Sequence, residues 1–216
     1  MKTAEDSTIQ DFFPKLKNHL LGRLLHIEYD GDKTPFTPTD RQTVMIVKDT
    51  IYQHQVFRVN YTSYDLCRSQ DSLNPRTHDY IMTLSRELGG ENDDPHPYWY
   101  AQILGIYHAK VIHTGPLSES REPQHMEFLF VHWFGRDMVS KAGGWRTKRL
   151  HRIGFVPGND EAAFGFLDPS CVIRGVHLIP AFAWGRTMEL LPPSKIARSV
   201  MNDSEDWTLF YIGMRV

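Results

Sequence analysis

The chain has 216 residues, of which 41% are hydrophobic, 12% aromatic and 23% charged, and its formal net charge is −2 at pH 7. This composition excludes a disordered chain and a uniformly basic protein, so any nucleic-acid contact has to come from a local patch. No apolar run approaches the ~18 residues of a membrane span, and the first ten residues lack the apolar core of a signal peptide. Two cysteines are too few for a disulfide framework or a cysteine zinc site, so we expect an intracellular protein with one main core.

Residues 7–25 are predicted to form a helix. Ser7 or Thr8 is a suitable N-cap, and Pro14 either kinks this helix or marks the first turn of a shorter one. Apolar side chains recur every three or four residues and make a single stripe, which consists of Ile9, Phe12, Phe13, Leu16, Leu20 and Leu24. Such a stripe is typical of a helix that covers a core.

Residues 30–41 combine glycine, proline, threonine and aspartate, which predicts a surface loop. The 29 residues before this loop are too few for an independent core. We therefore expect residues 1–41 to be a helix and loop packed on a β domain. That domain would comprise residues 42–216 and include a C-terminal extension.

After residue 42 the spacing of apolar side chains shifts from about 3.6 residues towards two, which is typical of strands. The polar residues 66–79 and the acidic residues 88–97 are predicted to be loops. Runs of β-branched and aromatic residues predict strands at residues 44–47, 55–61, 80–85, 98–113, 126–134, 153–156, 164–167 and 172–179.

The longest of these strands, residues 98–113, has apolar side chains at odd and even positions, with Gly105 as a natural place for a bend. Strict alternation would place Trp99, Ala101, Ile103 and Tyr107 on one face and Tyr100, Leu104 and Ile106 on the other. The predicted fold class is mainly β, or β-rich α+β. It would be a small twisted barrel or a bent antiparallel sheet with an N-terminal covering helix. The side chains expected in its core are Trp99, Ile103, Phe130, Trp133, Phe166 and Ile173.

Side chains capable of catalysis or metal binding are present, but none follows a recognised pattern. Eleven histidines invite a zinc hypothesis, yet the chain has no HExxH motif, and His108 and His113 would point to opposite faces of one strand. The carboxylates cluster in predicted turns, no Gly-x-Ser-x-Gly motif occurs, and Cys171 lies in an apolar run. We therefore predict no enzymatic activity, no metal site and no cofactor.

The sign of the charge reverses along the chain. Residues 1–132 carry 13 Lys+Arg against 18 Asp+Glu, whereas residues 133–198 carry 10 against 5. Residues 141–152, named here the basic segment, contain five positive side chains, one tryptophan and no acid. This combination suits phosphate contact and base stacking, although a solubilising surface loop has the same composition. The predicted nucleic-acid contacts are Lys141, Trp145, Arg146, Lys148, Arg149 and Arg152.

Four phrases that occur in order, YAQILGIYH, FLFVHWFGRD, RLHRIGFV and DPSCVIRGVHLIP, resemble a bromo-adjacent homology (BAH) domain over about residues 80–180. Trp133, Phe134 and Arg136 match the tryptophan element of that family, and the late strand of the family matches Ile173, Gly175 and Val176. The family reads chromatin, so the resemblance implies a BAH-like fold and a role in binding chromatin. Gly135 stands in the tryptophan element where readers of methylated lysine typically have an aromatic residue, so a complete aromatic cage is not implied.

Longer phrases resemble the carboxy-terminal region of Plavaka-type transposon proteins of mushroom-forming (basidiomycete) fungi, over nearly the whole chain. Among them are RSQDSLNPRTHDYIM and FGFLDPSCVIRGVHLIPAFAWGRT. In those proteins the catalytic core lies upstream. Together with the BAH resemblance and the basic segment, this likeness predicts a transposon-derived, non-catalytic BAH-like module that binds DNA or chromatin in the nucleus, with histones or other transposon-encoded proteins as further partners. The alternative is a structural or protein–protein interaction domain of a transposase without nucleic-acid contact, and a cytosolic location stays open.

Overall fold

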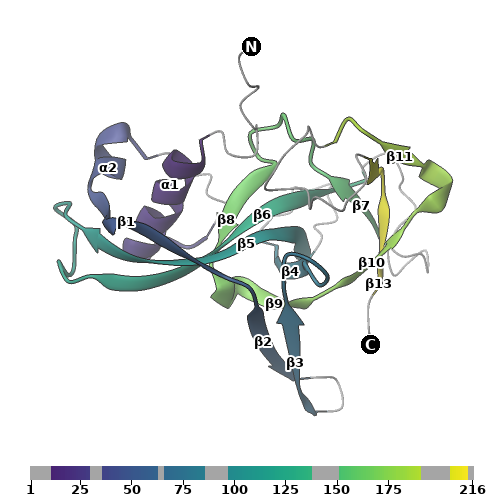
Figure 1. The fold of residues 1–216 in the computed structure, drawn as a ribbon, viewed down its shortest axis with the longest axis horizontal. Coiled ribbons are helices and arrows are strands. Elements are labelled where there is room, and N and C mark those ends of the chain that lie inside the picture. Colours follow the sequence, from purple (N-terminus) through teal and green to yellow (C-terminus); the bar gives the residue numbers. More distant parts are fainter. Residues whose placement is uncertain are drawn as a thin grey trace, which may run out of the picture.

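The computed structural model describes residues 11–29, 36–62, 66–85, 97–137, 151–190 and 205–213. More than half of these residues lie in antiparallel strands and few lie in helices, so the predicted mainly β class is confirmed. The strands form one nine-stranded sheet and two small two-stranded sheets (Figure 1). No closed barrel occurs within the described residues, so the bent antiparallel sheet is the better description.

Two long strands form the centre of the large sheet: β5 (Tyr98–His113) and β6 (Gln124–Arg136), which pair with each other. Each also pairs along its outer edge with two shorter strands in succession. On β5 these are β4 (Tyr80–Leu84) and β1 (Val44–His54), and on β6 they are β7 (Arg152–Phe155) and β8 (Phe164–Leu167).

The sheet is bent, and the strands at its two ends, β9 (Val172–Gly175) and β10 (His177–Pro180), are consecutive in the chain. β9 pairs with β4 at one end, and at the other end β13 (Phe210–Gly213) joins β7 to β10. Only Val176 separates β9 from β10, and its amide donates to the Tyr80 carbonyl at 2.9 Å. The end strands are thus connected by the chain rather than by a hydrogen-bonded ladder.

The helix α1 (Phe12–Leu24) packs on the sheet beside β8 and β1. It begins at Phe12 rather than at residue 7, so Pro14 lies in the first turn of a shorter helix, where its missing donor costs nothing. Arg23 ties the helix to the sheet through an ion pair with Asp168, 2.7 Å between Nε and Oδ2. The buried cluster between helix and sheet includes Leu16, Leu20, Leu21, Leu24, Phe128, Phe130, Phe164 and Phe166. No helix in the described part of the chain is long and apolar enough to span a membrane.

The prediction of a loop over residues 30–41 is wrong at its end, where the helix α2 (Pro38–Gln42) begins. The Asp40 amide donates to Thr37 Oγ1 and the Thr37 amide to Asp40 Oδ2, which together form a capping box. Proline, threonine and aspartate are turn formers and helix starters alike, so composition did not separate the two structures.

The prediction of a loop over residues 66–79 is wrong for its first half. β3 (Arg68–Leu73) lies there and pairs with β2 (Phe57–Thr62) as a hairpin. Polar side chains occupy the exposed face of β3, and a carboxylate occupies one of its inward positions, so hydrophobic alternation is almost absent. The other small ladder, β11 (Arg186–Thr187) with β12 (Asp206–Trp207), lies near the C-terminal end of the described chain.

Gly105 interrupts the pairing of β5 with β6, because the register shifts between Ile103 and this glycine. Beyond the bulge the side chains exchange faces: Ile106 shares a cluster with Ile103, whereas Tyr107 shares one with Leu104. The prediction that Ile103 and Tyr107 face the same side is therefore wrong, since one extra residue inverts the alternation. A Cβ at position 105 would overlap the Tyr107 ring, so glycine suits this bulge.

Half of the predicted core is fully buried and half is partly buried. Ile103, Phe130 and Phe166 are at most 1% exposed, whereas Trp99, Trp133 and Ile173 keep partial exposure. The two tryptophans meet edge to face, with 6.1 Å between ring centroids. They therefore lie at the margin of the core.

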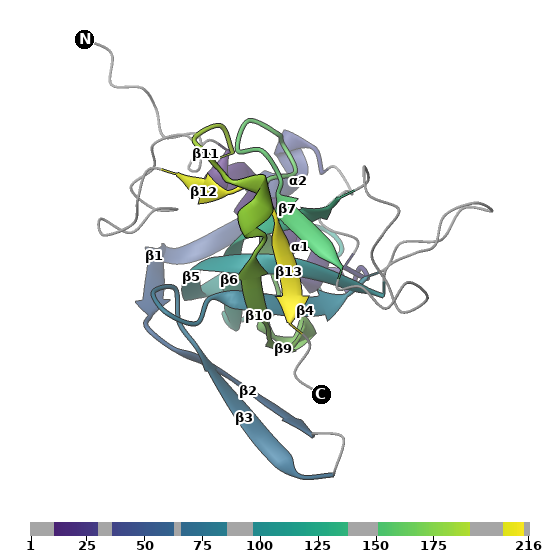
Figure 2. The same ribbon diagram turned by 90° about the vertical axis from the view of Figure 1, so that its right-hand side faces the viewer.

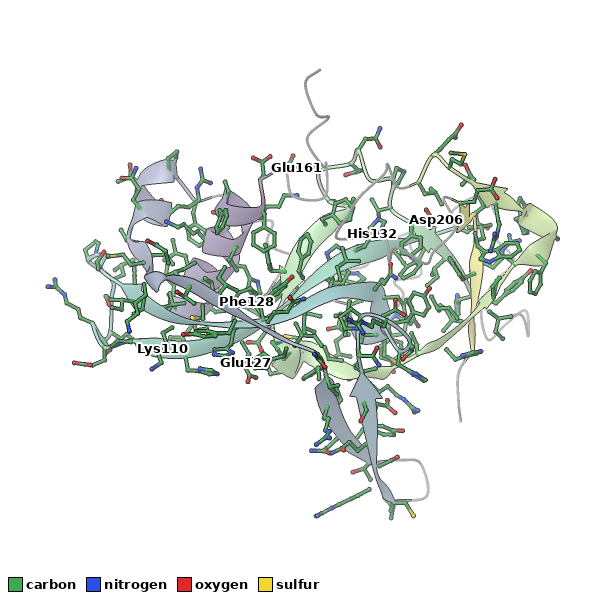
Figure 3. All side chains as sticks on the ribbon, viewed as in Figure 1. Lys110, Glu127, Phe128, His132, Glu161 and Asp206 are labelled. Atoms are coloured by element: carbon green, nitrogen blue, oxygen red, sulfur yellow. The ribbon has the colours of Figure 1, made fainter. Side chains whose placement is uncertain are left out.

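His132 of β6 is a buried packing residue (Figure 3). Its ring lies between those of Phe155 and Phe164, each at 4.5 Å between centroids, and its Nε2 is 2.8 Å from the Val156 carbonyl oxygen. An imidazole stacked in this way contributes area and one hydrogen bond to the core.

Candidate functional site

Two residues of the basic segment, His151 and Arg152, lie within the described structure, and Arg152 is the first residue of β7. Its guanidinium pairs with Asp137, 2.7 Å between Nη2 and Oδ2, and the side chain is only 14% exposed. The guanidinium also lies over the Trp184 ring, 4.8 Å from the centroid. The charge of Arg152 is thus compensated by a carboxylate. The other predicted contacts, Lys141, Trp145, Arg146, Lys148 and Arg149, lie outside the described residues.

Arg152 borders an exposed group of side chains, named here the aromatic–arginine surface. A short 3-10 turn (Phe182–Trp184) precedes β11, and β12 places Trp207 in register with Arg186. Figure 2 shows β11 and β12 side by side, above β10 and β13 in that view. The surface consists of Phe182, Trp184, Arg186, Met188 and Trp207, with Arg152 at its edge.

Ring contacts join three side chains of this surface. Arg186 Cζ lies 4.8 Å from the centroid of the Trp207 ring, and the Phe182 ring meets the same ring edge-on at 5.1 Å. Phe182, Trp184 and Met188 are nevertheless 70%, 50% and 62% exposed. These are three of the twelve large hydrophobic side chains that are exposed in the described chain. Apolar side chains gathered in this way are typical of a binding surface.

This arrangement suits a ligand with flat or apolar groups next to negative charge. Indole faces stack on nucleobases or on apolar side chains, and guanidinium groups pair with phosphate or carboxylate. Glu189 and Asp206 adjoin the surface in the chain, so it is not uniformly positive. The sequence of residues 181–187 (AFAWGRT) could have predicted the aromatic–arginine surface, because the small residues alanine and glycine leave the neighbouring large rings uncovered. The argument from charge pointed to the basic segment instead.

A second polar group, the imidazole cluster, lies on the sheet face opposite α1 and consists of His54, His108 and His125. His54 Nε2 lies 2.5 Å from His108 Nδ1, and the rings of His108 and His125 are 4.5 Å apart. Tyr52 stacks on His108, and Glu127, labelled in Figure 3, lies 3.7 Å from His125. The three histidines come from β1, β5 and β6, so only the pairing of those strands brings them together.

We expect the imidazole cluster to make stability depend on pH. Burial lowers the pKa of His108 below its usual 6.5, and His125 and His54 lower it further, while Glu127 acts in the opposite direction. Folded His108 therefore binds a proton less readily than it does in the unfolded chain. Its stabilising contribution is complete above about pH 6.5 and is lost as the pH falls through the folded-state pKa.

His108→Gln should accordingly make the fall in unfolding free energy between about pH 7 and about pH 5 shallower. Urea denaturation across this range measures the slope. His177→Gln, an exposed histidine outside the cluster, is the matched control and should leave the slope unchanged. An equally steep fall in His108→Gln would contradict the assignment.

The described residues contain no group of three or more histidine, cysteine or acidic side chains arranged to hold a metal ion.

The carboxyl of Asp79 is mostly buried, which raises its pKa above the ordinary value. Gln102 Nε2 donates to Asp79 Oδ2 at 2.6 Å, and the Ile103 amide donates to the Asp79 carbonyl at 2.7 Å. This carboxylate therefore joins the start of β4 to β5.

No protein-family model, curated protein or solved structure matches this chain. The described residues define an open, bent antiparallel β domain with a covering helix and an exposed aromatic–arginine surface. The likeness to BAH domains and to Plavaka-type transposon proteins stays a prediction from sequence phrases.

Proposed function

We propose that this protein is a non-catalytic recognition module that binds DNA or chromatin in the nucleus. In this proposal the basic segment contacts phosphate, and the aromatic–arginine surface contacts bases or sugars. The resemblance to BAH domains supports the proposal, because that family reads chromatin, and the resemblance to fungal transposon proteins supports a transposon origin.

The position of Arg152 is the observation that carries the proposal. It ends a segment with five positive side chains, and its guanidinium lies 4.8 Å from the centroid of the half-exposed Trp184 ring. Arg152 therefore places a cation against a ring face at the end of this segment, and cations beside ring faces bind nucleic-acid backbone and bases together. Arg186 beside Trp207 repeats the pairing of a cation with an indole.

A second candidate function is protein–protein interaction, and two observations favour it. Asp137 neutralises Arg152, which reduces its attraction for phosphate. Phe182, Trp184 and Met188 are exposed, and aromatic residues, methionine and arginine are enriched at protein interfaces. A histone tail or another transposon-encoded protein would be the ligand in that case.

Trp184→Ala should weaken binding to fluorescently labelled DNA about tenfold at low salt, because stacking on one aromatic ring contributes about 1–3 kcal/mol per base. Trp184→Phe keeps a ring face and should retain most of the affinity. Leu117→Ala, another strongly exposed apolar side chain, is the matched control and should bind as the wild type does. Fluorescence anisotropy at several salt concentrations provides the affinities.

The same titrations test the basic segment. Log affinity should fall linearly with log salt, and Lys148→Ala with Arg149→Ala should flatten this line by about one unit for each lost phosphate contact. Wild-type protein that binds neither single-stranded nor duplex DNA at low salt would overturn the proposal. Capture of a histone-tail peptide that depends on Trp184 would then support the second candidate.

A further inference from the structure

The hairpin of β2 and β3 projects away from the large sheet (Figures 1 and 2). Directly paired residues share a face of such a ribbon, and alternate pairs face opposite sides. The pairs Arg58 with Ser72, Asn60 with Gln70 and Thr62 with Arg68 lie on one side, and all six side chains are exposed. We name these six residues the polar ribbon face.

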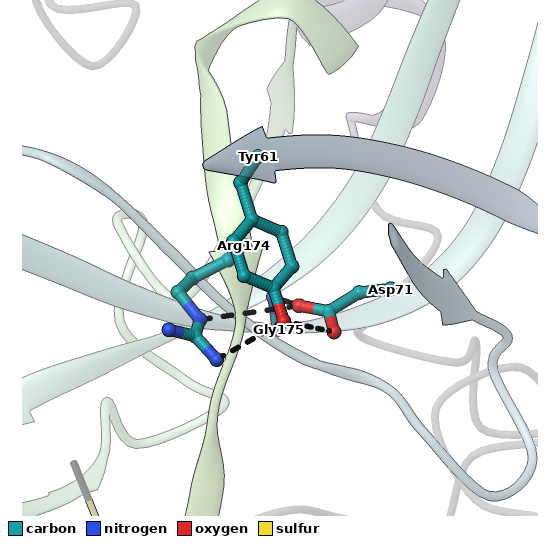
Figure 4. Close-up of polar contacts among 4 residues, drawn as sticks. All are labelled: Tyr61, Asp71, Arg174 and Gly175. Atoms are coloured by element: carbon teal, nitrogen blue, oxygen red, sulfur yellow. Dashed lines mark hydrogen bonds and ion pairs between the residues drawn. The ribbon is translucent and has the colours of Figure 1, made fainter. Parts of the chain in front are cut away.

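The opposite side of the hairpin is attached to β9. Asp71 Oδ2 accepts the Gly175 amide at 2.9 Å, and Asp71 Oδ1 accepts the Tyr61 hydroxyl at 3.2 Å (Figure 4). The Arg174 guanidinium lies over the Tyr61 ring at 4.4 Å, and Val59 and Leu73 are buried beside β9. Since this side is anchored to β9, the polar ribbon face on the other side is directed outward and the hairpin is held in place.

The chemistry of the polar ribbon face is that of base recognition. It carries two arginines, one asparagine and one glutamine, with no carboxylate among its six residues. Arginine binds the O6 and N7 acceptors of guanine, and asparagine or glutamine binds the N6 donor and N7 acceptor of adenine. No ion pair to Arg58 or Arg68 is formed within the described part of the chain, and the positive face complements the charge of DNA.

One hydrogen bond joins the two side chains at the centre of the polar ribbon face. Gln70 Nε2 donates to Asn60 Oδ1 at 2.7 Å. Within the described structure this leaves the Asn60 Nδ2 group as a donor and Gln70 Oε1 as an acceptor at the same cross-strand pair. That pair complements the N7 acceptor and the N6 donor of adenine.

The dimensions also fit. Each strand has six residues, so the face is about 20 Å long, and two strands lie about 4.8 Å apart. The major groove of B-DNA is about 12 Å wide and admits a two-stranded ribbon. Arg58 and Arg68 each lie two residues along a strand from the central pair, about 7 Å or two base-pair steps away.

We infer that the β2–β3 ribbon enters the major groove of duplex DNA and reads an A·T pair with a G·C pair on each side. This inference rests on the proposed function and specifies it, because it assigns base recognition to the ribbon and leaves phosphate and stacking contacts to the other surface. An A-form RNA duplex has a deep, narrow major groove that a ribbon cannot enter, so it is the matched negative probe.

The test is selection by the full chain from a pool of random-sequence duplex DNA. The enriched site should contain A·T with G·C about two base pairs away on either side. Asn60→Ala should lower affinity for that site about tenfold and leave affinity for unselected duplex unchanged. Arg58→Ala and Arg68→Ala should each lower it similarly. Arg121→Ala, an exposed arginine outside the ribbon, is the charge-matched control and should keep the preference.

The ratio of affinities for selected and unselected DNA does not depend on the folded fraction, so partial unfolding of a variant cannot imitate the result. Failure to enrich any sequence, or a ratio unchanged in Asn60→Ala and in both arginine variants, would overturn this inference alone if the wild type still binds DNA. Equal binding of an RNA duplex of the same sequence would also overturn it. If the wild-type protein binds no DNA at all, both the proposed function and this inference are overturned.

Discussion

Phe166→Ala should lower the free energy of unfolding by about 3–5 kcal/mol, the usual cost of truncating a fully buried phenylalanine. Phe166 is fully buried on β8, and its ring lies 5.0 Å from Phe12, 5.8 Å from Phe128 and 5.2 Å from Phe130. The substitution would leave a cavity between α1 and the sheet that three large rings cannot fill without leaving their positions. Urea denaturation followed by circular dichroism measures the loss, which is a large part of a typical domain's 5–15 kcal/mol.

Phe13→Ala is the matched control for this prediction. Phe13 is 59% exposed and lies next to Phe12 on the same helix, so its loss removes little buried area. We expect less than about 1 kcal/mol for this variant. Equal losses in the two variants would show that α1 does not dock on β8 in the way described.

Asp71→Ala should destabilise the β2–β3 hairpin by about 1–3 kcal/mol, because the Gly175 amide would lose its acceptor and the Arg174 guanidinium its nearby carboxylate. Asp71 is the only carboxylate in β3, and its two oxygens accept the Tyr61 hydroxyl of β2 and the Gly175 amide of β9. Amides of β2 and β3 should exchange hydrogen faster in this variant, while those of β5 and β6 keep their protection.

Tyr61→Phe provides a graded comparison. It removes only the 3.2 Å hydrogen bond to Asp71 Oδ1 and keeps the ring under Arg174, so we expect a smaller effect than in Asp71→Ala. Asp71→Ala should also weaken discrimination between DNA sequences by the polar ribbon face without changing the contribution of Trp184. Unaltered exchange in β2 and β3 would contradict the anchoring role of Asp71.

The three proposed contacts with DNA differ in how much of each could be predicted. The basic segment is contiguous, so counting charges was enough to find it. The aromatic–arginine surface joins residues 182–188 to Trp207 and Arg152, which only the pairing of β11 with β12 and the position of β7 bring together. The polar ribbon face was missed because β3 lacks the apolar alternation by which strands are predicted.

The physical reason for that miss lies in how β3 is held. Ser69, Asp71 and Leu73 share one side of β3, but Ser69 is exposed and only Leu73 is apolar. Asp71 is held by hydrogen bonds to β9 and Tyr61 instead of by apolar contact. Such partners are remote in the chain and leave no local pattern. The imidazole cluster is a similar case, since His54, His108 and His125 are separated by 54 and 17 residues.

By itself, the sequence determined the features that depend on near neighbours. The β-branched and aromatic runs in residues 98–113 and 126–134 predicted long strands, and Pro14 predicted either a kinked helix or a shorter helix that begins close to it. Tertiary structure decided which strands pair, which face each side chain takes beyond Gly105, and which charges are compensated, as Asp137 compensates Arg152. Local preferences act within a few residues, whereas register, bulges and ion pairs depend on the free energy of burying distant segments against one another.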